Sequence, residues 1–436
     1  MRNRIRKNGI TALVTIAILA TLTALGAAAY LVHEGLLFAP GTVQEKESLD
    51  HVPGDVSAPS PKEIIVESLL EPEVEEHVQE GDGSGARHVT PEELQSYQQA
   101  LKESVGNYCY EHLDAKDQHL YAEIYGILST FGTDTLLSTT DPDLLKHVFS
   151  CVMLDHPEIF YVTGYSLTKY TRNNMIEEIA FSGKYTMSAS EAMAMKAKVE
   201  ATATECLLNA PEGDDYEKVK YVYEWLIKRC NYVLDAENNQ NILSVFVTTD
   251  TVCQGYAKAA QYLLNRLGVF CILCEGEAMG SEAHVWNIVQ IDGEYYYLDV
   301  TWGDASYTFN ETDDAALMPP DINYEYMCVP YTEIAGTHLI QETVTLPACN
   351  SMRDNYYVRE GVYFTDVDEE QLKGAFAKAY DRGSDTVTLK CATDETFKEM
   401  ERYLIDREHI FDFLRGNSKV NYIKMEDRHL FVFYLN

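Results

Sequence analysis

The stretch HVWNIVQIDGEYYYLDV, residues 284–300, decides how the centre of this chain folds. Two runs rich in β-branched and aromatic residues flank Asp292-Gly293, a dipeptide that favours a two-residue type I′ turn. The pattern therefore predicts a β-hairpin whose register is set by the turn, with Ile291 opposite Glu294.

This register brings His284 and Asp299 together. Continuing the pairing outward places Trp286 opposite Asp299 and His284 opposite Thr301, so His284 and Asp299 become diagonal neighbours on one face of the sheet. Diagonal partners lie about 7–8 Å apart at Cα, close enough for a carboxylate to accept a hydrogen bond from an imidazole. Asp299 would then orient His284 as a general base. The alternative is an ordinary hairpin on which both side chains face solvent.

A helix is predicted just upstream, in TVCQGYAKAAQYLLNRLG, residues 251–268. Gly268 supplies the stop, and four apolar residues share one helical face: Ala257, Ala260, Leu264 and Leu267. Cys253 then lies at or just before the helix N-terminus, where free backbone N–H groups and the positive end of the helix dipole stabilise a negatively charged nucleophile. The alternative for Cys253 is a buried cysteine packed beneath a helix start.

Three motifs of this region closely resemble the bacterial transglutaminase-like superfamily: VCQGYA around Cys253, HVWN from His284, and YLDVTWGD around Asp299. Motifs of that family carry Cys, His and Asp in this order, and the resemblance covers about Asp215 to Asp304. It implies a papain-related α+β fold, in which the nucleophile helix packs against an antiparallel sheet that bears the His and the Asp. It also implies that the three residues form a catalytic triad.

Neighbours of the triad are candidates for a substrate groove. Trp286 and Trp302 could form its walls, although a tryptophan on a strand more often serves packing. Gln254 follows the nucleophile and could contribute to an oxyanion site, whose donors the sequence leaves unassigned. An acidic loop lacks the EF-hand spacing and is expected to be solvated, so no metal or cofactor is expected; its acids are Asp304, Asp313, Asp314 and Asp321.

The chain as a whole suggests five segments. They are a cytoplasmic tip with a transmembrane signal-anchor (1–39), a disordered acidic stalk (40–89), an N-terminal α+β extension (90–210), the transglutaminase-like core (211–345) and a small C-terminal α+β domain (350–436). The stalk is expected because its mixture of Pro, Glu, Ser and Gly offers too little apolar surface to offset the entropy of ordering.

The N-terminal segment is expected to meet a membrane. A charge-free run, Ile10–Val32, is long enough to cross a bilayer and follows Arg2, Arg4, Arg6 and Lys7. The positive-inside rule then places the rest of the chain outside the cytoplasm, as a single-pass protein of the cell membrane. The alternative is a secretory signal cleaved near Ala27–Ala29, which would release a secreted protein.

Charge indicates which partners to expect. The chain carries 69 acidic and 34 basic side chains, for a net charge of −35. Phosphate binding needs clustered Lys and Arg, which occur only at the N-terminal tip, so nucleic acid is not an expected partner. The expected partners are a protein or peptide substrate at the cell surface, and the membrane through the N-terminal helix.

The ten cysteines are too few for a dense disulfide framework in a chain of 436 residues. Cys271 and Cys274 lie three apart in an apolar strand and should face opposite sides, which suits neither a redox pair nor a shared metal ion. Cys328 and Cys349, in adjoining loop-like stretches, are the first pair to test for a disulfide.

Local signals predict further elements. Capping boxes at Thr90/Glu93 and Ser188/Glu191 start two helices. Strands are expected at 159–171 and 175–185, a helix at 216–230, and a closing hairpin at 420–425 and 429–434.

The sequence thus predicts a thiol acyl-transfer enzyme that forms an acyl-enzyme at a glutamine carboxamide or peptide carbonyl, resolved by water or an amine. The class covers cysteine peptidases, deamidases and cross-linking acyltransferases. The alternative is a non-catalytic surface-binding protein that uses the same fold as a scaffold.

Overall fold

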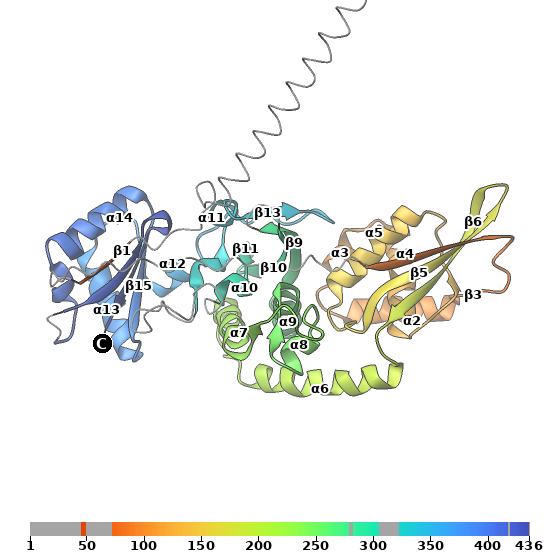
Figure 1. Ribbon diagram of the computed structural model, residues 1–436, viewed down its shortest axis with the longest axis horizontal. Helices are drawn as coiled ribbons and strands as arrows, with labels where there is room; N and C mark the ends of the chain where they lie inside the picture. The colour runs from red at the N-terminus through yellow and green to blue at the C-terminus, as the bar shows by residue number, and fades with distance from the viewer. Residues whose placement is uncertain (1–44, 49–71, 279–281, 305–321, 417–418, 436) are drawn as a thin grey trace, which may run out of the picture. The chain divides into compact units, whose positions relative to one another are not determined.

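The computed structural model describes residues 45–48, 72–278, 282–304, 322–416 and 419–435 (Figure 1). The chain separates into two compact units. Of the described residues, the smaller unit contains 45–48, 364–369, 376–416 and 419–435, and the larger unit contains 72–278, 282–304, 322–363 and 370–375. Sheets and helices occur together throughout the described chain, which confirms the predicted α+β class.

The N-terminal half of the larger unit is a five-stranded sheet with accompanying helices. The strand order is β2-β5-β6-β4-β3, in which β2 runs parallel to β5 and β5 antiparallel to β6. The strands are β2 (Glu73–Glu80), β3 (Arg87–His88), β4 (Thr135–Leu136), β5 (Val162–Arg172) and β6 (Met175–Tyr185). The helices are α2 (Pro91–Glu103), α3 (Tyr108–His112), α4 (Ala115–Ser129) and α5 (Pro142–Asp155).

Side-chain caps start helices where the sequence predicted them. The Thr90 hydroxyl accepts from the Glu93 N–H, and the Glu93 carboxylate accepts from the Thr90 N–H, which completes a capping box at α2. Ser188 and Glu191 form the same arrangement at α6 (Ala189–Leu208). A cap of this kind contributes about 0.5–2 kcal/mol to helix stability.

Strand β2 corrects the prediction of a disordered stalk over residues 40–89. All its residues are exposed, yet it pairs with β5 along its whole length. Lys169 of β5 and Lys184 of β6 also form ion pairs with its acids, Glu73, Glu75 and Glu76. The prediction from composition did not include this strand, because main-chain pairing at a sheet edge does not require burial of apolar side chains. Residues 49–71 of the predicted stalk lie outside the described residues.

The second half of the larger unit is built around an antiparallel sheet of order β12-β11-β10-β9-β13. Its strands are β9 (Cys271–Ala278), β10 (Glu282–Ile291), β11 (Glu294–Leu298), β12 (Met327–Val329) and β13 (His338–Gln341). Two short strands that precede it in the sequence, β7 (Asn231–Tyr232) and β8 (Asp250–Thr251), form a separate parallel pair. The helical elements are α6, α7 (Asp215–Arg229), α8 (Leu243–Phe246), α9 (Cys253–Arg266), α10 (Val300–Gly303), the 3₁₀ turn η3 (Tyr324–Tyr326), α11 (Tyr331–Ile334) and α12 (Tyr356–Glu360).

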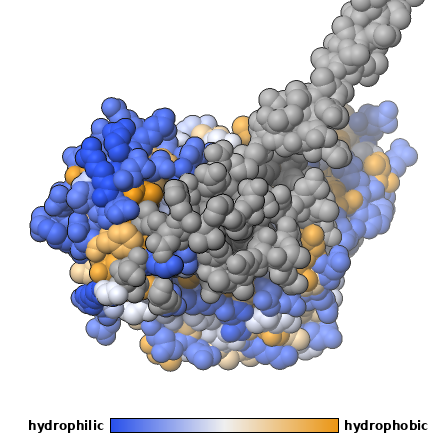
Figure 2. All heavy atoms as spheres, turned by 60° about the vertical axis from the view of Figure 1, so that its left-hand side comes forward, coloured by the Kyte–Doolittle hydropathy of each residue, from blue (hydrophilic) through white to orange (hydrophobic). Residues whose placement is uncertain are grey.

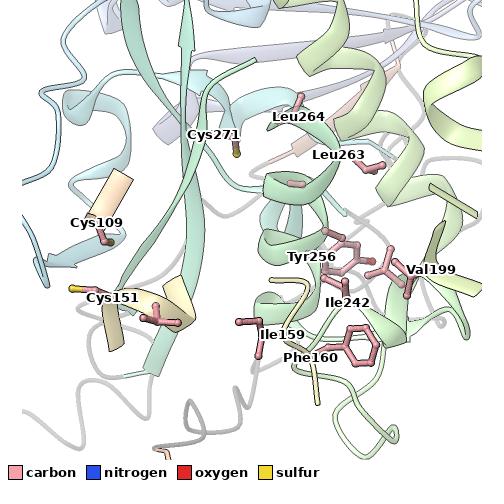
Figure 3. Close-up of a cluster of buried hydrophobic side chains, with 14 of the residues drawn as sticks. Cys109, Cys151, Ile159, Phe160, Val199, Ile242, Tyr256, Leu263, Leu264 and Cys271 are labelled. Carbon is pink, nitrogen blue, oxygen red and sulfur yellow. The ribbon is translucent and has the colours of Figure 1, made fainter. Parts of the chain in front are cut away.

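Helix α9 packs against one face of this sheet. Ala257 contacts Leu273 of β9 and Val285 of β10, and the Asn287 side chain donates to the Ala257 carbonyl over 3.0 Å. The rest of α9 lies in the main hydrophobic core (Figure 3), to which it contributes Tyr256, Leu263 and Leu264. Burial of each leucine side chain stabilises the fold by about 1.5–3 kcal/mol, so the start of α9 is held firmly against the sheet.

The opposite face of the sheet carries a second core. Cys274 lies in this core with Trp286, whereas Cys271 lies in the main core, as predicted for residues three apart on a strand. All ten cysteines are free thiols. Cys328 and Cys349 lie in different clusters, so the pair proposed for a disulfide is not one in this structure.

The smaller unit is a mixed sheet and helix structure of order β1-β16-β17-β15-β14. Its predicted closing hairpin is confirmed, because β16 and β17 pair antiparallel. The strands are β1 (Glu45–Ser48), β14 (Tyr363–Phe364), β15 (Thr386–Cys391), β16 (Asn421–Met425) and β17 (Leu430–Tyr434), with helices α13 (Glu369–Asp381) and α14 (Asp394–Glu401).

The surface of the described residues is mainly hydrophilic in the view of Figure 2, in keeping with the acidic composition. Within the described part of the chain, no helix is both long and apolar enough to cross a membrane. The predicted anchor, Ile10–Val32, lies outside the described residues, so membrane attachment stays a prediction.

Candidate active site

Cys253 is the first residue of α9. The preceding residue, Val252, is extended (φ −130°, ψ −174°) and provides no side-chain cap, so the first N–H groups of the helix are not satisfied by a capping side chain. These groups and the helix dipole favour a negative charge at the position of the thiol. The Cys253 side chain is almost completely buried, with 2% of its surface exposed.

Gly255 allows the start of α9 to lie close to the segment before it. A Cβ atom at this position would stand 1.9 Å from Thr251 Oγ1, 2.6 Å from Ser244 Oγ and 2.7 Å from the Asn239 carbonyl oxygen. The two hydroxyls are 2.7 Å apart and both lie within hydrogen-bonding distance of the Asn239 carbonyl oxygen, so they form a fixed support. The glycine of the CQG motif therefore positions the neighbouring Cys253 by its lack of a side chain.

The predicted hairpin is confirmed over its paired residues. Asp292 (φ 48°) and Gly293 (φ 84°) both have positive φ, as a type I′ turn requires. Pairing runs from Ile291 opposite Glu294 to Asn287 opposite Leu298, in the predicted register.

Beyond Leu298 the prediction needs a correction, because the expected pairs of Trp286 with Asp299 and His284 with Thr301 are not formed. Asp299 leaves the strand instead. Its N–H donates to the Tyr326 carbonyl over 3.0 Å, and its side chain caps α10. The capping interaction ends the strand one residue before Asp299.

The carboxylate of Asp299 nevertheless reaches His284. His284 Nε2 lies 2.7 Å from Asp299 Oδ2, and both residues are 0% exposed. Asp299 Oδ1 accepts the backbone N–H of Trp302 over 3.1 Å. The contact anticipated from the hairpin is therefore present, with the carboxylate held from two directions.

Electrostatics favour a charged pair. Burial opposes protonation of His284, but the charge and hydrogen bond of Asp299, together with the interaction with the Cys253 thiol, raise the pKa of His284 to about 10. Burial likewise opposes ionisation of Asp299, but His284 and a second histidine, His338, hold the pKa of this carboxyl below its usual range. His284 Nδ1 is buried and has no conventional hydrogen bond among the described residues. It is therefore the ring nitrogen available to exchange a proton with Cys253.

His338 was missed by the sequence analysis. Its Nε2 lies 3.0 Å from Asp299 Oδ2, and its Nδ1 lies 2.8 Å from Thr337 Oγ1. The residue comes from edge strand β13, 39 positions after Asp299, and no local motif marks it. Only the pairing of β13 with β9 brings it to the site.

The three groove candidates have different surroundings. Trp286 is 1% exposed and lies in the second core, where its ring stacks on His284 at 5.7 Å, so its position is that of a packing residue. Trp302 is 7% exposed and contacts the Tyr326 ring at 5.0 Å. Gln254 is partly exposed, and its Oε1 accepts a hydrogen bond from Lys258 Nζ over 3.0 Å.

Asp304 departs from the expected solvated loop. It is 2% exposed, and its Oδ2 accepts the Tyr256 hydroxyl over 2.7 Å. This bond ties the end of α10 to α9. The other acids of the predicted loop, Asp313, Asp314 and Asp321, lie outside the described residues.

His284, Asp299 and His338 together have a composition that can hold a metal ion, with one ligand atom from each within 4.8 Å of the others. Both imidazole nitrogens, however, lie at direct hydrogen-bonding distance from one carboxylate oxygen, at 2.7 and 3.0 Å. Donors around a tetrahedral zinc ion, bound at about 2.0–2.1 Å, stand roughly 3.3 Å apart. The arrangement fits a proton-sharing network better than a metal centre.

None of these residues lines the depression found among the described residues, and we assign that depression no role in catalysis. Its lining includes Tyr108, Asp155, Leu273, Glu275, Gln341 and Val344.

Comparison with known proteins agrees with the motifs. Residues 202–300 match the family model "Transglutaminase-like superfamily". The curated "Kyphoscoliosis peptidase" of Mus musculus is 26% identical over 106 residues, covering 20% of this chain and 16% of that protein, and the Homo sapiens protein gives the same values. The chain thus spans about a sixth of the length of these curated relatives.

Two solved structures are also similar. "Crystal structure of a TGase" has a TM-score of 0.24 and 14% identity, and covers 36% of this chain and 48% of that chain. A "Putative Cysteine Protease from Cytophaga hutchinsonii" has a TM-score of 0.23 and 11% identity, and covers 42% of this chain and 71% of that chain. Cys253, His284 and Asp299 all lie within the segment, residues 202–300, that matches the transglutaminase-like superfamily model.

Proposed function

We propose that this protein is a thiol acyl-transfer enzyme with Cys253 as nucleophile, His284 as general base and acid, and Asp299 as the residue that orients His284. The observation that carries the proposal is the buried His284–Asp299 hydrogen bond of 2.7 Å, with Nδ1 left free of conventional hydrogen bonds at the start of the nucleophile helix.

The proposed reaction has two halves. Cys253 Sγ attacks the carbonyl carbon of a glutamine carboxamide or a peptide as the thiolate, with its proton already on His284 Nδ1, because the pKa of His284 is raised to about 10. The imidazolium then protonates the departing nitrogen, so that ammonia or an amine leaves and a thioester remains. Water or a second amine next attacks the thioester and loses its proton to His284, and Cys253 leaves as the thiolate beside the imidazolium. Asp299 stabilises the imidazolium in both halves.

The substrate class is a protein or peptide, because the reacting group is a carboxamide or an amide. We place the reaction outside the cytoplasm, on the basis of the basic tip and the apolar run at Ile10–Val32. Water as acceptor would make the enzyme a deamidase or peptidase, and an amine would make it a cross-linking acyltransferase.

One observation favours the alternative of a non-catalytic scaffold. Within the described residues the site is closed, with Cys253 2%, His284 0% and Asp299 0% exposed. A scaffold needs no access to Cys253, whereas an enzyme must open a path to it.

Thiol labelling separates these two functions. Burial raises the pKa of seven other thiols, which should remain unreactive: Cys206, Cys230, Cys271, Cys274, Cys328, Cys349 and Cys391. Iodoacetamide followed by peptide mass spectrometry should therefore label Cys253 fastest in the wild type. His284→Ala should slow that labelling, while His156→Ala, which removes another buried histidine, should not. Equal and slow labelling of Cys253 in all three proteins would favour the scaffold.

Turnover is tested with cell-surface proteins and a labelled amine. Amine incorporation, deamidation or cleavage should appear with the wild type and disappear with Cys253→Ala. Identical products, or none, from both proteins would contradict the enzymatic function.

A further inference from the structure

His338 occupies a position that packing alone does not explain. It is 3% exposed and is surrounded by aromatic rings, with Trp302 at 4.7 Å, Trp286 at 4.9 Å and Tyr326 at 6.0 Å. An apolar ring would satisfy those neighbours. Both of its nitrogens are instead within hydrogen-bonding distance of polar atoms, at 2.8 and 3.0 Å.

The protons of this network can be assigned from its chemistry. Asp299 Oδ2 is shared by two imidazoles, and because the carboxyl is ionised, each Nε2 must donate to it. Burial lowers the pKa of His338, so this ring is neutral and its Nδ1 is an acceptor. The Thr337 hydroxyl, 2.8 Å from Nδ1, then donates to it.

Thr337 has a second possible acceptor. Its Oγ1 also lies 3.1 Å from the Ile334 carbonyl oxygen, but the hydroxyl carries only one proton. Donation to His338 fixes the Nε2–H tautomer, and donation to Ile334 would release it. The side chains thus form a continuous chain: Thr337, His338, Asp299, His284 and Cys253.

We propose that His338 is a positioning residue, whose Nε2–H holds the Asp299 carboxylate in the orientation that binds His284, with Thr337 selecting the required tautomer. This inference rests on the proposed function, because it adds a fourth side chain to the same site. His338 acts through Asp299 and does not touch the reacting atoms.

Removal of the donor changes the charge balance of the site. The titratable groups facing His338 are His284 from β10, Asp299 at the start of α10 and Tyr326 from η3. Trp286 and Trp302 fill the remaining contacts without charge. Loss of one of three donors to the carboxylate weakens the stabilisation of its ionised form, so the pKa of Asp299 should rise and activity should begin at a higher pH.

Two substitutions separate donation from packing. His338→Phe keeps an aromatic ring but removes the N–H, whereas His338→Gln can place an amide N–H near the position of Nε2. In the full chain, His338→Phe should lower kcat about 10- to 100-fold with little change in KM, and should move the acidic limb of the pH profile upward. His338→Gln should recover most of kcat. His156→Phe, at a buried histidine outside the site, should leave both parameters unchanged.

Equal losses with His338→Phe and His338→Gln, without movement of the acidic limb, would overturn the proposal. Circular dichroism and thermal melting identify any variant that has failed to fold. Thr337→Val provides an independent test that leaves His338 in place. It should lower kcat in the direction of His338→Phe, and full activity would contradict the role of Thr337 as tautomer selector.

A measurement without substrate keeps this proposal distinct from the function itself. In ¹⁵N-histidine NMR spectra, the His338 signal, assigned by its loss in His338→Gln, should show a protonated Nε2 and an unprotonated Nδ1. The Nδ1–H tautomer would overturn the proposal even in an active enzyme. Absence of turnover with the Nε2–H tautomer present would instead contradict only the proposed function.

Discussion

Replacing Gly255 by alanine should impair the site without removing any functional atom. Its Cβ would stand 1.9 Å from Thr251 Oγ1, whereas ordinary contact begins at 3.4 Å, which leaves a deficit of about 1.5 Å. Rotation of the threonine does not resolve the clash, because Ser244 Oγ at 2.6 Å and the Asn239 carbonyl at 2.7 Å are also too close. The start of α9 must therefore move, and Cys253 with it.

The size of the effect follows from that movement. Overpacking in a close-packed region costs about 1–3 kcal/mol of stability. A displacement of about 1 Å between reacting groups lowers the rate on the order of 100-fold. We therefore expect Gly255→Ala to lower kcat/KM about 100-fold while the protein remains folded.

The assay is the rate of amine incorporation or deamidation, with the rate of Cys253 alkylation as a readout that needs no substrate. Gly374→Ala is the matched control, since Gly374 is exposed in α13 and a Cβ there meets nothing within 4 Å. Adding Thr251→Ala to Gly255→Ala should restore only part of the rate, because the Asn239 carbonyl remains. Activity of Gly255→Ala within about threefold of the wild type would refute the reasoning.

Three further predictions concern the charges and bonds of the site. Because Asp299 raises the pKa of His284 to about 10, the imidazolium persists up to that pH, and Asp299→Asn should move the alkaline limb of the kcat profile to lower pH; an unmoved limb would contradict the pairing. Tyr256→Phe removes a buried hydrogen bond of 2.7 Å to Asp304 and should lower the free energy of unfolding by about 1.5–3 kcal/mol, measured in urea. A loss below about 0.5 kcal/mol would show that this hydrogen bond does not stabilise the fold as expected. Burial lowers the pKa of Lys258 to about 8, so the rate of its acylation, followed by mass spectrometry, should be half-maximal near that pH. Exposed lysines should reach half-maximal acylation only at a higher pH. The same half-maximal pH for Lys258 and the exposed lysines would count against a desolvated Lys258 ammonium.

The sequence by itself determined those features that depend on residues close together in the chain. Asp292 and Gly293 adopt positive φ and fix the hairpin register, because few other residues accept that backbone conformation. The capping boxes follow from side chains within a few residues of each helix start, and α9 follows from the apolar residues that share one of its faces. Local conformational preferences were sufficient for these elements.

The tertiary structure decided which distant groups complete the site. Asp299 leaves the hairpin because its side chain caps α10 and its N–H bonds to Tyr326, a competition that pairing arithmetic does not include. His338 joins Asp299 across 39 residues, and Tyr256 joins Asp304 across 48, each through a buried hydrogen bond. A single sequence does not reveal such contacts, because they depend on how the strands and helices pack and on which polar groups that packing removes from water.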